Sequence, residues 1–423
     1  MTIVLLLSLL VVTLLIGIPV AFALGGIGLA MLLYAGFSPI MAPMAIYSSF
    51  DSFILLSVPL FLMMSNILLQ GGVGRDLFRA VQSWVGHWPG GLGIATIASC
   101  TIFSAISGSS VATAATIGSI AINEMTERGY NRPFVYGLIA AGGTLGILIP
   151  PSIPMIVYGV ITEESIVDLF LAGIVPGLLM ATGFILYCLF YARYSKDYIA
   201  SEKATSAERK SATLRALPTI FLATIIIGGI YTGIFTPTES AGVGVTVSLA
   251  IVILMRTFSV EKFKAAAMNT MKHTVTIFLI IAGAKVFSKA ITLYQIPQDI
   301  SMLVSENISE VGLFIAAVCF ILLIMGFFLE SVSMLLIMMP VLYPSLGLLG
   351  IDPIWFAIIF VIMIECALIT PPVGLNLFVI QSVSGGRSSE IIQGVWPFIL
   401  IMLLCLLLVF FFPSIALYVP FNF

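Results

Sequence analysis

The sequence is poor in charged residues, histidine and clustered cysteine. Charged residues make up 9% of the 423 positions, whereas about 25% is usual in soluble domains. The two histidines and five cysteines are scattered, so the spacing of a His/Cys metal site is missing. The formal net charge is −2, without the basic excess of nucleic-acid-binding proteins. We therefore expect no metal enzyme, no organic cofactor and no nucleic-acid partner.

Hydrophobic residues are abundant instead, at 60% of the chain. Stretches such as 217–234, 311–329 and 398–412 are almost uncharged and long enough to cross, or nearly cross, about 30 Å of hydrocarbon. They are continuously apolar, whereas the strands of a membrane barrel alternate in polarity. We predict an all-α integral membrane protein with about 10–12 membrane helices. The apolar run 1–33 has no basic leader or cleavage site, so we expect it to be a retained first span.

One long polar stretch lies near the middle of the chain, and it divides the sequence into two halves. Residues 193–216 are rich in lysine and arginine, which places this linker in the cytoplasm by the positive-inside rule. The predicted units are a first repeat at 1–192 and a second repeat at 217–423.

The two halves share an ordered set of residues. A shift of about 221 places Pro150-Pro151 on Pro371-Pro372 and Gly129 on Gly350. The turn 124–132 contains two arginines, whereas its counterpart contains no lysine or arginine. Equivalent turns on opposite sides of the membrane indicate an inverted-topology repeat, an architecture typical of secondary transporters.

Polar islands interrupt the apolar sequence of the first half. The serine-rich segment 104–113 predicts the tip of a re-entrant helical hairpin near 95–123, although small residues also allow close helix packing. The segment 142–154 contains three prolines within five residues, which predicts a broken helix near 134–160. Its freed carbonyls suit sodium, and half-helix N-termini suit a substrate carboxylate. A kink healed by neighbouring helices is the alternative.

The second half carries the corresponding islands. Residues 326–333 predict the tip of a second hairpin near 311–347, with Glu330 at membrane depth. The segment 370–376 predicts a broken helix near 354–384, with Asn376 just beyond the break.

Four further charged residues lie within apolar sequence. Glu239 and Glu365 can serve either as hydrogen-bonding groups between helices or in transport. Lys285 and Lys289 share one helix face, and we expect them to reach the interface or contact a partner subunit or lipid phosphate. The charged segment 75–79 reads as an interfacial turn.

Four motifs together carry a family resemblance. The segments 107–113, 149–152, 233–239 and 370–376 resemble the large membrane subunit of TRAP (tripartite ATP-independent periplasmic) transporters. The similarity spans essentially the whole chain and leans toward the sialic acid branch, while the C4-dicarboxylate branch shares the motifs.

The resemblance implies a multi-pass protein of the bacterial inner membrane that takes up a small organic acid by sodium symport and an elevator mechanism. It also implies two partners, a small four-helix membrane subunit and a periplasmic substrate-binding protein, within a shell of membrane lipids.

Site residues follow from the same resemblance by position. The first sodium site would comprise Ser107, Gly108, Ser110, Thr144, Gly146 and Pro150. The second would comprise Gly326, Glu330, Ser331, Thr370 and Val373. Substrate would lie near Ser109, Ser152, Thr370 and Asn376.

Two rival classes are less consistent with the pattern. Polar breaks also build channel filters, but these islands differ from one another and do not form a symmetric ring. The segment Ser107-Gly108-Ser109 superficially resembles a nucleophile turn, but His87 and His273 lie outside the polar islands. We therefore expect a transporter and not an enzyme. Because the islands contain hydroxyls, amides and few titratable groups, they favour sodium coupling over proton coupling.

Overall fold

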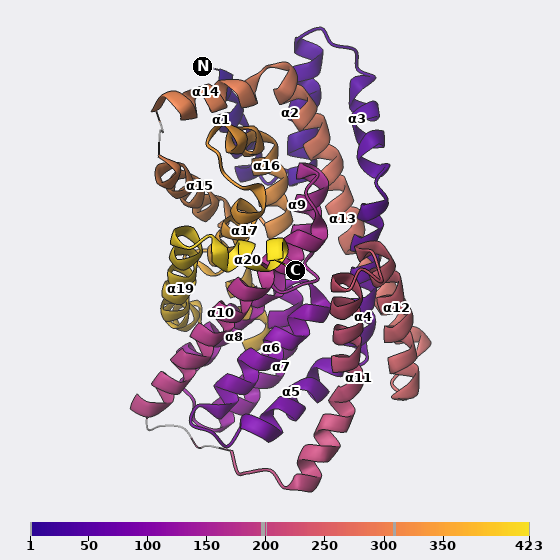
Figure 1. Ribbon diagram of the computed structural model, residues 1–423, viewed down its shortest axis with the longest axis vertical. Helices are drawn as coiled ribbons and strands as arrows, with labels where there is room; N and C mark the ends of the chain where they lie inside the picture. Colours follow the sequence, from indigo (N-terminus) through magenta and orange to yellow (C-terminus); the bar gives the residue numbers. More distant parts are fainter. Residues whose placement is uncertain (1, 196–198, 200, 308–309, 423) are drawn as a thin grey trace.

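The computed structural model describes residues 2–195, 199, 201–307 and 310–422, and these form an all-helical protein (Figure 1). The first half contains α1 (Thr2–Leu15), α2 (Val20–Tyr34), α3 (Met41–Phe50), the 3₁₀ helix η1 (Phe53–Leu56), α4 (Ser57–Gln70), α5 (Val73–Val85), α6 (Gly91–Ser107), α7 (Ser110–Glu127), α8 (Arg132–Leu148), α9 (Ile153–Thr162) and α10 (Ile166–Tyr194). The second half contains α11 (Ser206–Tyr231), α12 (Pro237–Leu254), α13 (Val260–Leu293), α14 (Ile296–Asn307), α15 (Val311–Met325), α16 (Ser331–Leu348), α17 (Pro353–Ile369), α18 (Leu375–Ser384), α19 (Ser388–Phe411) and α20 (Ser414–Asn422).

The predicted all-α membrane class is confirmed. Within the described residues, 8 helical segments are long and apolar enough to cross a bilayer. Five further apolar helices of 10–17 residues are shorter, and several of these adjoin the predicted breaks. The division into short helices reflects glycine and proline, since the first permits left-handed backbone and the second lacks an N–H donor.

The expectation of one span over residues 1–33 is wrong. The helix α1 ends at Leu15 and α2 begins at Val20. Between them Gly17 adopts a φ of +90°, a backbone conformation that glycine adopts without strain. Pro19 then supplies no backbone N–H to continue the helix, so the apolar run forms two helices.

The polar linker is shorter than predicted, because α11 begins inside it. The Thr205 backbone N–H donates to the Glu208 carboxylate at 2.7 Å, and the Glu208 N–H donates to the Thr205 hydroxyl at 3.3 Å. This reciprocal capping box starts the helix at Ser206. Residues 196–198 and 200 of the predicted linker lie outside the described part of the chain. The segment 75–79, expected to be a turn, lies within the helix α5.

Each half contains a helical hairpin and a broken helix at the positions where the sequence has polar islands. The hairpins are α6–α7 and α15–α16, and the broken helices are α8–α9 and α17–α18. Within each half, the first arm of the hairpin packs against the first part of the broken helix, α6 against α8 and α15 against α17. The boundaries of the repeats themselves stay a prediction.

Contacts between the halves follow an exchange pattern. The hairpin arm α7 packs against α18, and its counterpart α16 packs against α9. In the same way α8 packs against α19 while α17 packs against α10, and α2 packs against α13 while α12 packs against α4. Each half therefore completes the packing of the other, as expected of two related units joined about a pseudo-twofold axis.

The equivalent turns of the two halves lie at opposite ends of the molecule. The Ile199 N–H donates to the Arg128 carbonyl oxygen at 2.9 Å, so the turn after α7 lies beside the linker at the bottom of Figure 1. The C-terminal end of α16, which leads into the equivalent turn of the second half, packs against α14 at the top of Figure 1. There the hydroxyls of Ser301 and Ser345 are 3.0 Å apart. This arrangement agrees with the orientation that the basic residues predict.

The helices gather into two groups. One group contains α2, α3, α4, α11, α12 and α13, which lie largely on the right of Figure 1. The other contains both hairpins, both broken helices, α10, α19 and α20. The helix α5 packs on both groups, on α11 of the first and on α6 and α7 of the second. Packing of α4 on α6 and of α13 on α16 also joins the groups.

The crossing of α8 and α19 depends on two facing glycines, and this generates a stability prediction. A Cβ atom on Gly394 or Gly137 would overlap the backbone of the other helix. We expect Gly394→Val to destabilise the fold by about 1–3 kcal/mol through overpacking, measured as a lower melting temperature of the purified protein. The control Gly242→Val adds the same side chain where no atom lies within 4 Å, and an equal loss there would contradict the explanation.

Candidate functional site

The tip of the first hairpin lies against the break of the first broken helix. The helix α6 ends at Ser107, Gly108 has a φ of +56°, and α7 begins at Ser110. The Ser109 hydroxyl accepts a hydrogen bond from the Ala112 N–H at 3.4 Å and caps α7. A Cβ atom on Gly108 would lie 2.7 Å from the Pro151 carbonyl oxygen. The tip is therefore held directly beside the proline break.

A group of oxygen atoms gathers behind this tip. The hydroxyls of Ser107 and Thr113 are 2.7 Å apart. A Cβ atom on Gly146 would lie 2.9 Å from the Ser109 carbonyl oxygen and 3.1 Å from the Thr113 hydroxyl. Four residues predicted for the first sodium site, Ser107, Gly108, Ser110 and Gly146, thus lie around one hairpin tip. The sequence did not single out Thr113 individually as a ligand.

The second half reaches this cluster through Asn376. Its side-chain amide donates to the Ser110 hydroxyl at 2.5 Å. The Asn376 side chain is fully buried, and its Oδ1 has no hydrogen-bond partner. A buried amide oxygen without a partner is costly, so this atom is available to a ligand.

The tip of the second hairpin carries an acid beside its serines. Glu330 occupies the residue before α16 and does not cap it through its side chain. Its Oε1 is buried and has no hydrogen-bond partner. At the end of α15, Gly326 lies in close contact with Ala367, three residues before Thr370. This hairpin therefore also meets the break of its own broken helix, α17–α18.

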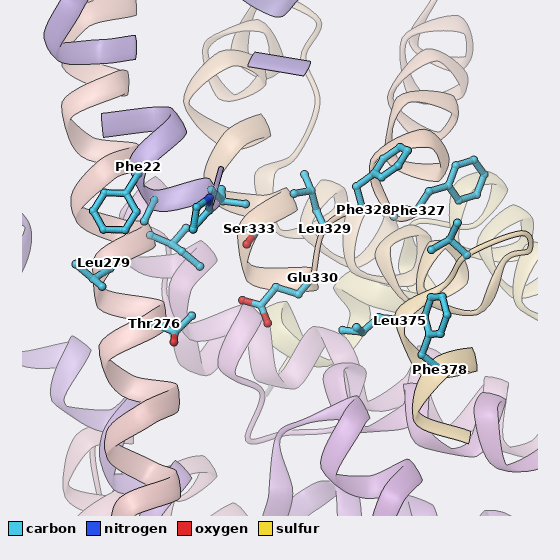
Figure 2. Close-up of a pocket in the computed structure, with 16 residues that line it drawn as sticks. Phe22, Thr276, Leu279, Phe327, Phe328, Leu329, Glu330, Ser333, Leu375 and Phe378 are labelled. Atoms are coloured by element: carbon cyan, nitrogen blue, oxygen red, sulfur yellow. The ribbon is translucent and has the colours of Figure 1, made fainter. Parts of the chain in front are cut away.

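Two adjoining cavities lie between these elements. The larger is about 590 Å³ and is lined by α2, α13, α18 and the second hairpin tip. The smaller, about 80 Å³, lies between the two tips and is lined by Ser109, Ser110 and Ser331 among others. Glu330 and Leu375 line both cavities. Figure 2 shows the Glu330 carboxylate pointing into the larger cavity, toward the helix that carries Thr276.

The predicted site residues differ in their access to these cavities. Those that line the smaller cavity are Gly108, Ser109, Ser110, Glu330 and Ser331. Those that line the larger cavity are Gly326, Glu330 and Val373.

The remaining predicted hydroxyls bond to backbone. The Ser152 hydroxyl caps α9 by accepting from the Met155 N–H at 3.4 Å. The Thr144 and Thr370 hydroxyls donate to the carbonyls of Ala141 and Cys366 at 2.7 and 2.6 Å. None of these three residues, nor Pro150, lines either cavity, and their ligand roles stay predictions.

Sequence reasoning missed the contribution of α13. His273 and Ile277 line the smaller cavity, and Thr276 and Ile280 line the larger. These residues recur at helical spacing on one face. Only His273 and Thr276 are polar on this face of α13. The pattern of polar and apolar residues therefore gave little indication that the face lines a cavity.

The other charged residues have separate surroundings. Glu239 forms a capping box with Thr236, whose backbone N–H donates to the carboxylate at 2.9 Å, which supports a structural role within its own helix. Glu365 is completely buried, and neither carboxylate oxygen has a hydrogen-bond partner. Lys285 and Lys289 line a groove between α3 and α13, and no residue of either hairpin tip lines this groove.

The chemistry of the site is that of hard oxygen donors. Hydroxyls, backbone carbonyls, one amide oxygen and one carboxylate surround the tips, and no group of three or more His, Cys, Asp or Glu residues is found in the part of the chain described here. Such a donor set suits an alkali cation better than a transition metal. Helix N-termini at Ser110 and Ser331 face the same space and favour an anion.

Comparison with known proteins gives a consistent result. Residues 7–415 match the family described as the tripartite ATP-independent periplasmic transporter, DctM component. A C4-dicarboxylate TRAP transporter large permease protein of Pseudomonas aeruginosa is 40% identical, covering 93% of this chain and 92% of that protein. A sialic acid TRAP transporter large permease protein of Vibrio cholerae is 32% identical, covering 96% and 95%.

A solved structure shares the fold. The YdaH transporter of Alcanivorax borkumensis superposes with a TM-score of 0.61 over 89% of this chain and 88% of that chain, at 13% identity. With the two adjoining cavities, the paired hairpins and a family match that spans nearly the whole sequence, the chain belongs to the DctM family, the large permease component of TRAP transporters in the bacterial inner membrane.

Proposed function

We propose that this chain carries out sodium-coupled uptake of a small organic acid. The observation that supports the proposal most is the meeting of two hairpin tips and two helix breaks around adjoining cavities. Glu330 lines both cavities and its Oε1 is buried without a partner, as is the Oδ1 of Asn376, whose amide nitrogen donates to Ser110 beside the smaller cavity. Buried polar atoms of this kind are expected to be satisfied by a bound ligand or by water.

Sodium is the coupling ion that the donor set favours. At the first tip the Ser107 and Thr113 hydroxyls lie beside the Ser109 carbonyl oxygen, and the Pro151 carbonyl oxygen lies close to Gly108. At the second tip Glu330 lies near the backbone around Gly326. Oxygen ligands from loops and broken helices coordinate hard cations well. The two sites differ chemically, because only the second contains a carboxylate.

The substrate class follows from relatives and from electrostatics. Relatives are named for C4-dicarboxylates at 40% identity, for ectoine in Halomonas elongata at 35% and for sialic acid at 32%. Greater similarity to a C4-dicarboxylate permease makes that class the first to test, with sialic acid, which the motifs favoured, as the second candidate. Either acid would place a carboxylate near the helix N-termini at the two tips.

The partners follow from the tripartite family. We expect a small four-helix membrane subunit and a periplasmic binding protein that delivers the substrate. A relative of Oleidesulfovibrio alaskensis, named an isethionate TRAP transporter permease protein DctMQ, is 34% identical. This chain covers 64% of that relative, which leaves room there for a second component within one polypeptide.

The division into two helix groups is consistent with an elevator mechanism. The group with both hairpins would carry substrate and sodium, while the group around α4, α12 and α13 would stay fixed. The groups meet through α4 and α11 on α6, through α13 on α16 and through α5 on α11, and rigid-body movement of one bundle against another is a recurrent form of alternating access.

The central prediction concerns coupled uptake. Proteoliposomes containing this chain and its small subunit should accumulate labelled succinate or sialic acid only with an inward sodium gradient and the cognate binding protein outside. Uptake that follows a pH gradient in sodium-free buffer would contradict sodium coupling. Rapid flux without the binding protein would favour a channel instead.

A second prediction concerns the acid at the second tip. Glu330→Gln removes a charge but keeps the shape of the side chain, so we expect ion-coupled uptake to fall about tenfold or more through a weaker sodium site. Expression and melting temperature should stay near the wild type. Glu390→Gln, at a partly exposed helix start that lines neither cavity, is the control. Wild-type uptake by Glu330→Gln would assign Glu330 a packing role.

A third prediction concerns the first tip. Gly146→Ala places a methyl group 2.9 Å from the Ser109 carbonyl oxygen, which must displace an oxygen of the proposed sodium site. We expect a higher sodium concentration for half-maximal uptake. The control Gly347→Ala adds a methyl group where no atom lies within 4 Å, and equal sodium dependence of both variants would argue against this site.

A further inference from the structure

His273 lies at the smaller cavity, although it belongs to neither hairpin nor broken helix. It is carried by α13, in the helix group opposite the one that contains the tips. The same cavity is lined by Ser109 and Ser110 of the first tip and by Glu330 of the second. The histidine therefore faces the space between the two tips from the other helix group.

Two basic residues of α13 are neighbours in the sequence but differ in their surroundings. Lys272 and His273 are consecutive, and of the two only His273 lines the cavity between the tips. Consecutive residues of a helix point about 100° apart, because a turn takes 3.6 residues. The histidine is therefore the basic residue of this pair that α13 presents to the tips.

The ionisable residues that line the two cavities are few, and His273 is one of them. Among the residues that line the two cavities, His273 is the sole side chain with a basic nitrogen, and Glu330 is the sole acid. No hydrogen bond is present between His273 and another described residue, and its side chain is exposed to the cavity region. An imidazole N–H can donate to a carboxylate in either charge state.

We infer that His273 is a substrate-contacting residue that donates a hydrogen bond to the carboxylate of the organic acid while the acid lies between the two tips. This inference rests on the proposed function, because it requires an anionic substrate. The contact comes from α13 and not from the helices that would move, so it exists only when the tips lie beside this helix. His273 thus adds selectivity for acids in one position of the transport cycle.

The test is direct binding to the purified complex of this chain with its small subunit. Thermal stabilisation by succinate and by sialic acid is titrated in sodium chloride, and stabilisation by sodium alone is measured against choline chloride. We expect His273→Ala to weaken the apparent affinity for the acid about 10- to 100-fold, the range for a lost hydrogen bond to a charged group. Stabilisation by sodium alone should not change.

A conservative variant separates contact from folding. His273→Asn keeps an N–H donor and should recover part of the affinity, whereas His273→Leu should behave like His273→Ala. The matched control is His87→Ala, which removes the other histidine of the sequence at a position outside both cavities, and it should bind the acid like the wild type.

Three outcomes would overturn the inference. Equal affinity of His273→Ala and the wild type for the acid would overturn it alone, leaving the proposed function intact. A parallel loss of sodium stabilisation and acid binding would assign His273 a structural role. A wild-type complex that binds no organic acid would overturn the proposed function together with this inference.

Discussion

The structure depends on one constraint, that backbone N–H and C=O groups inside a hydrocarbon layer need partners within the protein. A continuous helix meets this constraint within itself, but four helices are interrupted at membrane depth, and each interruption leaves backbone groups without helical partners. The molecule accommodates them by placing each break against another: Gly108 lies on the Pro151 carbonyl, and Gly326 lies on Ala367. The polar groups freed by one break thereby face those freed by another, and the site is the place where they collect.

The same constraint explains how much the sequence could predict. Breaks depend on local residue types, so they can be predicted from the sequence. The double prolines at Pro150 and Pro371 located the broken helices, and the serines of the first tip located the first hairpin. The first apolar run was misjudged, because Gly17 and Pro19 were treated as tolerated within a span. The capping box at Thr205 was overlooked inside a charged segment, since composition alone suggested a linker.

Site membership was harder to predict, because it depends on packing between segments far apart in the sequence. Asn376 was recognised as polar beyond a break, but its partner Ser110 lies 266 residues earlier. Thr113 belongs to the motif 107–113 but was not distinguished within it, and His273 lies outside every motif, in a helix that forms no part of a hairpin or broken helix. Conversely, Ser152 has the expected residue type, yet its hydroxyl caps α9 and lines neither cavity.

The bond between Asn376 and Ser110 also bears on biosynthesis. Ribosomes add about 5–20 residues per second, so the first hairpin is made about 13–50 s before the chain reaches Asn376. During that interval the Ser110 hydroxyl lacks its amide partner. The hairpin arm α7 lacks its contact with α18, and α8 of the broken helix lacks its contact with α19. A nascent first half therefore has a serine hydroxyl and two helix faces without their final partners, and its packing is completed only when the second half has been made.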